Sequence, residues 1–140
     1  MLTINEYRKV ESLEEAYELN QKKNNKIIAG GVWMKIGDRR IATAIDLSGL
    51  GLDQITETDT EFVMTTLREI EKHAGLAAYT DGAIRESVRH IVGVQFRNCA
   101  TVGGSIFGRF GFSDVLTVFL AMDTQVELYH AGMVSLKEFI

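Results

Sequence analysis

Four glycines mark the segment Phe96-Arg-Asn-Cys-Ala-Thr-Val-Gly-Gly-Ser-Ile-Phe-Gly-Arg-Phe-Gly-Phe-Ser-Asp114, and a strongly apolar helical pattern follows it. Two of them, Gly103 and Gly104, are adjacent, and without Cβ atoms their backbone N–H groups can approach a bulky ligand closely. Consecutive N–H groups in such a turn can form a concave site for a phosphate. A second pair, Gly30-Gly31, follows the apolar run Ile27-Ile28-Ala29. The two pairs predict one ligand with an extended polyphosphate, held from two sides; two ordinary tight turns are the alternative.

The overall composition is that of a globular protein without a nucleic-acid or membrane partner. Its 140 residues fit one domain, or two small subdomains that share a core. Hydrophobic residues make up 46% and charged residues 24%, which is typical of soluble proteins. The net charge of −4, without a basic run, argues against nucleic acid. Every apolar run is shorter than the roughly 20 residues that span a bilayer, and the N-terminus lacks a signal-peptide core. We therefore expect a cytoplasmic protein.

The residues that usually carry catalysis or bind metals are few and scattered. A single cysteine, Cys99, excludes an internal disulfide framework and a multi-cysteine metal site, and its apolar neighbours predict a small core residue. The histidines His73, His90 and His130 have no ligand-like spacing, and no nucleophile is placed beside a base. We predict no metal site and no catalytic side chain.

The first 50 residues predict a parallel βαβ-like unit. Short strands are expected over Leu2–Tyr7, Lys26–Ala29 and Ile41–Leu47. The capping-box signature Ser12-Leu-Glu-Glu15 starts a helix between the first two strands. Strands that alternate with a helix in this way imply parallel pairing.

The remaining residues predict an α+β arrangement beyond a hinge at Ser48–Asp53. The expected elements follow in chain order: a hairpin over residues 54–65, a helix from the capping box Thr66–Glu69, a helix over Thr80–Ile91, an extended stretch at Val94–Phe96, a helix over Val115–Met122 capped by Ser113-Asp114, a strand over Gln125–Tyr129, and a third capping box at Ser135–Glu138.

Several motifs stand in a characteristic order along nearly the whole chain. They are Ile27-Ile-Ala-Gly-Gly31, Asp46-Leu-Ser48, Met64-Thr-Thr-Leu-Arg-Glu-Ile70, Arg97-Asn-Cys-Ala-Thr-Val-Gly-Gly104, Asp114, and Phe119-Leu-Ala-Met-Asp-Thr-Gln-Val-Glu-Leu128. Together they resemble the FAD-binding subunit of the molybdenum hydroxylases, which include xanthine dehydrogenase, carbon monoxide dehydrogenase and aldehyde oxidase.

The resemblance implies a two-lobed FAD-binding domain of the vanillyl-alcohol-oxidase (PCMH) type over residues 1–140. Residues 1–50 would form a small parallel βαβ lobe. Residues 51–140 would form a larger lobe with an antiparallel or mixed sheet and flanking helices. The C-terminal domain that usually follows in the family is absent from the sequence, so FAD retention is expected to depend on the partners.

The resemblance also implies which residues contact FAD. The first segment would wrap the pyrophosphate and adenosine: Ile27, Ile28, Ala29, Gly30, Gly31, Val32, Trp33 and Met34. The second would bind the pyrophosphate through backbone N–H groups and a threonine hydroxyl: Thr101, Val102, Gly103, Gly104 and Ser105. Asp114 would accept hydrogen bonds from the sugar portion, and Ile91 would pack against the cofactor.

The chain departs from the family pattern at several of these positions. Val32-Trp33 stands where the first loop usually has Thr-Asp, and Ser105 stands in place of an asparagine. A stretch of small residues and proline is replaced by one with three phenylalanines: Phe107, Phe110 and Phe112. Trp33 either packs over the adenine or lies in the core. The phenylalanines either cover the flavin, face a partner or are buried.

Four polar residues within or just after the glycine-rich stretch have a structural and a functional interpretation. Arg97 and Asn98 are expected to fix the shape of the segment and not to touch the ligand. Arg109 is expected to be solvated, and neutralisation of a phosphate is its alternative role. Asp114 would bind the cofactor, but an acidic residue is also favoured at a helix start for its own sake.

The resulting functional prediction is an electron-transfer component of an oxidoreductase complex. By the resemblance, a molybdenum-cofactor subunit oxidises the substrate and a [2Fe–2S] subunit passes the electrons to FAD, which reduces NAD or another acceptor. Such a chain is not expected to oxidise substrate alone. The alternatives are a truncated, cofactor-free docking subunit and a stand-alone small flavoprotein. An exposed core face would also favour self-association as a homo-oligomer.

Overall fold

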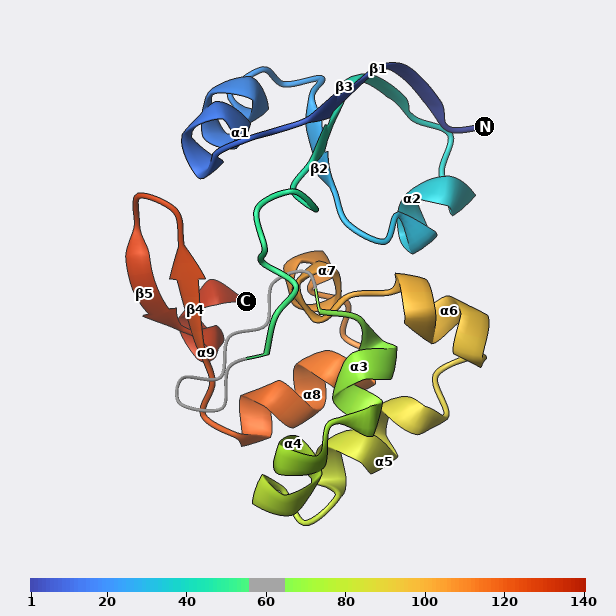
Figure 1. The fold of residues 1–140 in the computed structure, drawn as a ribbon, viewed down its shortest axis with the longest axis vertical. Coiled ribbons are helices and arrows are strands. Elements are labelled where there is room, and N and C mark those ends of the chain that lie inside the picture. The colour runs from blue at the N-terminus through green and yellow to red at the C-terminus, as the bar shows by residue number, and fades with distance from the viewer. Residues whose placement is uncertain (56–64) are drawn as a thin grey trace.

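A computed structural model describes residues 1–55 and 65–140, which form two lobes (Figure 1). The first lobe consists of a small sheet with two helices. The second lobe is built mostly from short helices, and a β-hairpin from the C-terminal part of the chain lies along one side of it. The α+β class with a small parallel lobe and a larger second lobe is confirmed.

The small lobe contains the parallel unit predicted from the strand and helix pattern. Its strands are β1 (Thr3–Lys9), β2 (Lys26–Ile28) and β3 (Arg40–Asp46), in the order β1-β3-β2. Both pairings are parallel, with Tyr7 opposite Ala44 and Ile27 opposite Ile45.

Two helices connect these strands, and only the first was predicted. Helix α1 (Leu13–Asn20) begins as expected, with the Ser12 hydroxyl accepting the N–H of Glu15 at 3.1 Å. The Glu15 carboxylate accepts the N–H of Glu11 at 2.9 Å. Helix α2 (Val32–Ile36) is a single short helix directly after Gly31.

The small lobe has its own hydrophobic core. Its buried members come from the end of β1, α1 and β3: Val10, Ala16, Ile45 and Leu47. Leu50 and Leu52, from the segment predicted to be a hinge, pack against this core. The connection between the lobes is therefore attached to the small lobe by apolar side chains.

The large lobe consists of short helices and one hairpin in the described residues. The elements are α3 (Leu67–Lys72), α4 (Ala74–Tyr79), α5 (Ala83–Arg89), α6 (Val94–Cys99), α7 (Val102–Gly108), α8 (Asp114–Ala121), β4 (Gln125–Leu128), β5 (Gly132–Ser135) and α9 (Leu136–Phe139). The strands β4 and β5 pair antiparallel. The capping boxes predicted at Thr66 and Ser135 are both present, and Ser113 caps α8.

Two local predictions for residues 94–99 are wrong. The stretch Val94–Phe96 is helical, not extended, because Phe96 packs against the large core and this tertiary contact overrides the weak helix propensity. Cys99 is exposed and is not a core residue. The predicted hairpin over residues 54–65 lies largely outside the described residues.

The core of the large lobe is centred on helices α3, α5, α7 and α8. Its most buried side chains include Ile70, Ile84, Val88, Val102 and Phe119. Ile84 and Val88 lie on α5, within the helix predicted over Thr80–Ile91. Within residues 1–55 and 65–140, none of the helices combines the length and apolar character needed to cross a membrane.

Candidate functional site

The two glycine segments meet where the lobes touch. A Cβ atom at Gly30 would lie 1.6 Å from the carbonyl oxygen of Cys99 and 2.4 Å from its carbon. The main chain of the first segment therefore crosses directly over the main chain that leads into the second. Val32, two residues on, packs against the core of the large lobe. Segments about 70 residues apart in the sequence are thus in direct contact.

The first segment presents an open turn at Gly31. Its φ of +66° lies in the left-handed region, where glycine is favoured. A Cβ atom there would have no heavy atom of the described chain within 4 Å apart from its immediate neighbours. Gly31 also precedes α2 without a side-chain hydrogen bond to the first turn of that helix. This turn has the free space that a bound group needs.

The second segment differs from the predicted glycine turn, because Gly103 and Gly104 lie in the first turn of α7. The Thr101 hydroxyl caps the helix and accepts the N–H of Gly104 at 3.1 Å. The N–H of Ser105 bonds to the carbonyl of Thr101 at 3.0 Å, and the Ser105 hydroxyl donates to the same carbonyl. Several polar groups expected to bind pyrophosphate therefore already have partners within the chain.

Helices α3 and α7 begin side by side and hold each other in place. The N–H of Leu67 donates to the carbonyl of Ala100 at 2.9 Å, and the N–H of Val102 donates to the carbonyl of Thr65 at 3.0 Å. These bonds form an antiparallel bridge between Thr66 and Thr101, which are the capping residues of the two helices. The start of the second segment is thereby fixed to the framework of the large lobe.

Arg97 fixes the approach to the second segment, as predicted. It is only 5% exposed, and it donates to the Glu71 carboxylate at 2.8 Å and to the Ile91 carbonyl at 3.0 Å. Arg68 also pairs with Glu71, at 2.7 Å. Burial alone would raise the pKa of Glu71, but the hydrogen bonds and charges of the two arginines outweigh it and lower this pKa. The Ile91 side chain packs against the core of the large lobe.

The Trp33 ring of α2 contacts two rings of the connection between α7 and α8, those of Phe110 and Phe112. We call these three side chains the aromatic cluster. The ring centroid of Trp33 lies 5.4 Å from that of Phe110 and 5.9 Å from that of Phe112. The rings of Phe110 and Phe112 are stacked at 5.3 Å, with 19° between their planes. Their exposed fractions are 50%, 38% and 69% in the same order, so none of the three is an ordinary core residue. Phe107 lies outside the cluster and is 74% exposed.

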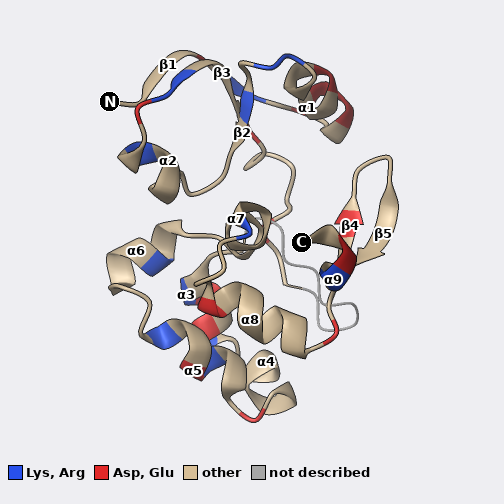
Figure 2. Cartoon of the chain, turned by 180° about the vertical axis from the view of Figure 1, so that it is seen from behind, with Lys and Arg blue, Asp and Glu red and all other residues tan. Residues whose placement is uncertain are grey.

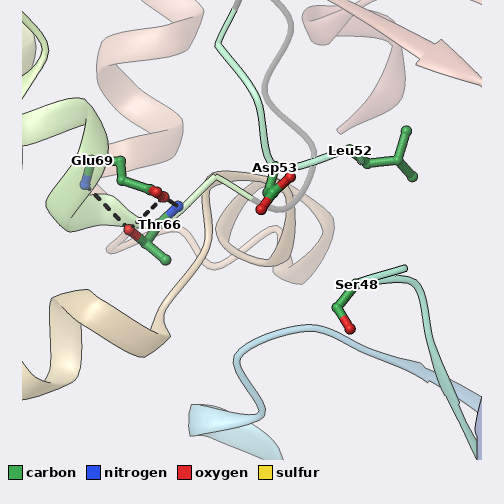
Figure 3. Close-up of a pocket in the computed structure, with 5 residues that line it drawn as sticks. All are labelled: Ser48, Leu52, Asp53, Thr66 and Glu69. Atoms are coloured by element: carbon green, nitrogen blue, oxygen red, sulfur yellow. Dashed lines mark hydrogen bonds between the residues drawn. The ribbon is translucent and has the colours of Figure 1, made fainter. Parts of the chain in front are cut away.

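A small pocket lies between the connecting segment and the start of α3 (Figure 3). Its lining includes Ser48, Leu52 and Asp53 on one side and Thr66 and Glu69 on the other. The N–H and hydroxyl groups of Thr66 each donate to the Glu69 carboxylate at 2.8 Å. The pocket volume of about 190 Å³ is below the roughly 300–1,000 Å³ of typical ligand sites. Two carboxylates line it, which makes it unsuitable for a diphosphate.

The remaining charged candidates lie in less specific surroundings. Figure 2 shows acidic residues on α1 and basic ones on α2, α6 and near α7. Residues 27–37 and 96–113 contain no acidic residue, and their exposed basic residues are Lys35 and Arg109, which suits an anionic ligand; Arg97 is paired with Glu71. The Arg109 guanidinium lies 4.2 Å from the ring centroid of Phe139. Asp114 is exposed at the first position of α8.

Two of the histidines, His73 and His130, contact neighbouring groups of the fold. His73 accepts the N–H of Leu76 through Nδ1 and so caps α4, a helix the sequence pattern missed. His130 packs against the rings of Tyr17 and Tyr129, which join α1 to the β4–β5 turn. In the part of the chain that the structure describes, no group of three or more His, Cys, Asp or Glu side chains could hold a metal ion.

A family model described as the FAD binding domain in molybdopterin dehydrogenase matches residues 3–140. A curated relative, the uncharacterized protein YgfM of Escherichia coli strain K12, is 24% identical over 145 aligned residues, which cover 98% of this chain and 54% of the relative. The chain thus spans about half the length of the curated relative it matches.

Solved structures of two kinds of enzyme share the fold. Quinoline 2-oxidoreductase from Pseudomonas putida 86 matches with a TM-score of 0.81 and 20% identity, over 96% of this chain and 51% of that one. A Cu,Mo-CO dehydrogenase matches with a TM-score of 0.82 and 21% identity, over 97% and 52%. Carbon monoxide dehydrogenase from Hydrogenophaga pseudoflava matches with a TM-score of 0.79 and 23% identity, over 93% and 49%.

Proposed function

The chain belongs to the family of FAD-binding domains of molybdopterin dehydrogenases, and on that premise we propose that it binds FAD where its two glycine segments meet. The observation that carries this proposal is the contact of Gly30 with the Cys99 carbonyl, which brings the two segments together. Residues 1–50 and 51–140 are then the two lobes of one FAD-binding domain, with the cofactor at their junction.

The residues present fit a diphosphate better at the first segment than at the second. At Gly31 the turn is open and left-handed, and the basic residue Lys35 lies in α2, the short helix that follows it. At Thr101–Ser105, in contrast, the N–H groups of Gly104 and Ser105 already donate hydrogen bonds to Thr101. We therefore assign the main diphosphate contacts to Gly31 and the residues after it, and a supporting role to Gly103 and Gly104.

We propose further that the chain works as an electron-transfer component of a multi-subunit oxidoreductase. FAD, when bound, can accept electrons singly and release them in pairs to an acceptor such as NAD. The residues of this chain would bind and orient it, and none need act as an acid or a base. The partners would be a [2Fe–2S] subunit, which delivers the electrons, and a molybdenum-cofactor subunit, where substrate is oxidised. A cytoplasmic location and self-association belong to the same proposal.

A pair of matched substitutions tests the cofactor site. Gly31 and Gly82 both have left-handed φ values, of +66° and +80°, both precede a short helix, and both have open space at the Cβ position. Aspartate tolerates this conformation and should leave both variants folded. Gly31→Asp places a carboxylate beside the proposed diphosphate, so we expect at least a tenfold loss of FAD affinity, about 1.4 kcal/mol.

Gly82→Asp serves as the control and should bind FAD like the unchanged protein. Binding is measured by flavin absorbance that co-elutes with the protein and by titration. Equal affinities for the two variants would contradict the site at Gly31. A folded protein that binds no FAD would contradict the proposed function itself.

A cofactor-free docking subunit is the second candidate, and one observation favours it. The N–H groups of Val102, Gly104 and Ser105 all donate to acceptors within the chain, which leaves fewer donors for a diphosphate than the family resemblance implies. Absence of FAD binding by a folded chain would select this candidate, and a pull-down with the molybdenum and [2Fe–2S] subunits would then test it.

A further inference from the structure

We propose that the aromatic cluster is a stacking surface for one of the two planar ring systems of FAD. This inference rests on the proposed function, because it supposes that FAD binds at the junction of the lobes. Its starting observation concerns Trp33 in α2 and the pair Phe110 and Phe112 between α7 and α8. Their rings lie against one another while each keeps a large exposed area.

The cluster is held in a defined shape by the backbone around it. The N–H of Ser113 donates to the carbonyl of Phe110 at 3.0 Å, which closes a turn with Phe110 and Phe112 at its first and third positions. The Phe110 ring lies against Gly108, where a Cβ atom would approach the ring within 2.8 Å. The two rings are therefore positioned before any ligand arrives, which reduces the ordering that binding requires.

The exposure of the cluster leaves room for another ring. A side chain that only joined the lobes would be expected to bury most of its area, yet Trp33 and Phe112 are half or more exposed. Aromatic side chains of this kind provide stacking surfaces for bases, because every base has a π-face. An exposed set of neighbouring rings also gains more from being covered than isolated rings do, since a single planar ligand can contact several of them.

The place of the cluster suits a ring attached to a diphosphate. Trp33 lies in the first turn of α2, two residues after the open turn at Gly31. In FAD, the adenine is joined to the diphosphate through a ribose and the isoalloxazine through a ribityl chain, so a diphosphate near Gly31 places one ring within reach of Trp33. Contact with all three residues would also connect the two lobes through the ligand.

The single tryptophan makes this inference directly testable. Trp33 is the only tryptophan of the chain, so intrinsic fluorescence excited at the indole reports on this cluster alone. We expect FAD to quench Trp33 emission in a saturable manner. Titration of the unchanged protein and of Phe112→Ala with ADP and with FMN then identifies the ring: a loss of ADP affinity in the variant assigns the adenine, and a loss of FMN affinity assigns the isoalloxazine.

Two phenylalanine variants separate stacking from general surface effects. Phe112→Ala removes a ring of the cluster and keeps the Trp33 reporter, and we expect FAD affinity to fall about tenfold or more. Phe107→Ala is the control, since Phe107 is a similarly exposed phenylalanine of the same stretch outside the cluster, and its FAD affinity should not change.

The outcomes distinguish this inference from the proposed function. If flavin co-elutes with the protein but Phe112→Ala binds FAD as tightly as the unchanged protein, the stacking surface is wrong and the FAD function stands. If the folded chain binds no FAD by co-elution, both are wrong. A loss of affinity in Phe107→Ala equal to that in Phe112→Ala would also overturn the assignment to the cluster.

Discussion

Gly30-Gly31 and Gly103-Gly104 are the same dipeptide, and each lies at the start of a short helix, but glycine is needed for different reasons in the two places. At the first pair, one glycine allows two main chains to touch and the other adopts a left-handed φ. At the second pair, Gly104 has an ordinary helical position and its N–H is capped by Thr101. The requirement for glycine is set by the backbone around it and is not readable from the dipeptide.

The two pairs also differ in whether their glycines contact the rest of the chain or leave space for a ligand. The crossing at Gly30 brings the lobes together, whereas the open turn at Gly31 leaves space for a group that the chain itself does not supply. The second pair is already integrated into the hydrogen bonds of α3 and α7. Substitutions at the two pairs should therefore differ in how strongly they affect folding.

The largest effect is expected for Gly30→Ala. Its Cβ would lie 1.6 Å from the Cys99 carbonyl oxygen, a backbone atom that cannot rotate away. The two segments must separate, and we expect a loss of about 3 kcal/mol or more in the free energy of unfolding, at the upper end of overpacking effects. Urea unfolding followed by circular dichroism measures it.

Gly37→Ala is the matched control for this substitution. Gly37 has an ordinary φ of −82°, and its nearest contact for an added Cβ is 3.5 Å, so the unfolding midpoint should barely move. An unchanged midpoint for Gly30→Ala would show that the lobes do not cross as described.

The next effect concerns the support of the second segment by Arg97. Replacing Arg97 with methionine keeps much of the volume but leaves the Glu71 carboxylate, whose side chain is 11% exposed, with Arg68 as its remaining partner. Breaking a buried pair costs about 3–5 kcal/mol when the other charge stays unpaired, and Arg68 should reduce this to about 2–3 kcal/mol. Chemical denaturation measures the loss.

Arg89→Met provides the comparison, because the pair of Arg89 with Glu86 is exposed. Exposed pairs contribute about 0–1 kcal/mol, so this variant should remain close to the unchanged protein. Similar losses in the two variants would mean that burial of the Arg97 pair does not matter for stability.

The contribution of the Glu71–Arg97 pair to stability should also depend on pH. The pKa of Glu71 is lowered below its ordinary value of 4.5 in the folded chain, chiefly because its bonds to Arg97 and Arg68 outweigh the opposing effect of burial. The folded state then binds fewer protons than the unfolded state, so this contribution is present above pH 4.5 and is lost as pH falls through the lowered pKa.

Glu71→Gln isolates this contribution, since its side chain does not titrate. We expect the stability difference between the unchanged protein and this variant to shrink as the pH is lowered from about 6 to about 3. Thermal unfolding over that range measures it, and a difference that stays constant or grows would contradict the assignment to Glu71.

The two lobes differ in how much of their secondary structure the sequence predicts. In the small lobe, the predicted strands agree with β1, β2 and β3 within about two residues, because the apolar residues of β2 and β3 and the Ser12 cap between β1 and β2 produce local patterns. In the large lobe, the sequence pattern does not predict α4, α6 and α7. Val94–Phe96 has β-branched and aromatic residues, and only the burial of Arg97 and the packing of Phe96 make it helical.

The candidate site was predictable in its segments but not in its geometry. Order and spacing of the motifs predict that Gly30-Gly31 and Gly103-Gly104 contact one ligand, and the structure brings Gly30 against Cys99, four residues before Gly103. The crossing of Gly30 over Cys99 and the meeting of Trp33 with Phe110 depend on how the lobes pack, and no local pattern in the sequence encodes that contact. The same packing exposes Cys99, which its apolar neighbours had suggested was buried.

The smallest effect is expected for Gly104→Ala, and it is the most direct comparison with Gly30→Ala. The added Cβ would approach only the Thr101 hydroxyl, at 2.9 Å, a side-chain atom that can shift by a few tenths of an ångström. Weakening this cap costs up to about 1 kcal/mol, while alanine in place of glycine favours the helix by about 1 kcal/mol. The unfolding free energy should therefore change by less than about 0.5 kcal/mol, whereas Thr101→Val, which removes the cap without that gain, should lose about 1 kcal/mol.

A large loss of stability in Gly104→Ala would contradict this account and would mean that the second pair, like the first, needs glycine for backbone contact. A stable Gly104→Ala variant with weakened FAD binding has a different meaning. Because folding does not require glycine at this position, such a result would show that the missing Cβ serves the cofactor. Measuring unfolding and FAD affinity on the same variant thus separates the role of the second pair in the fold from its role in the site.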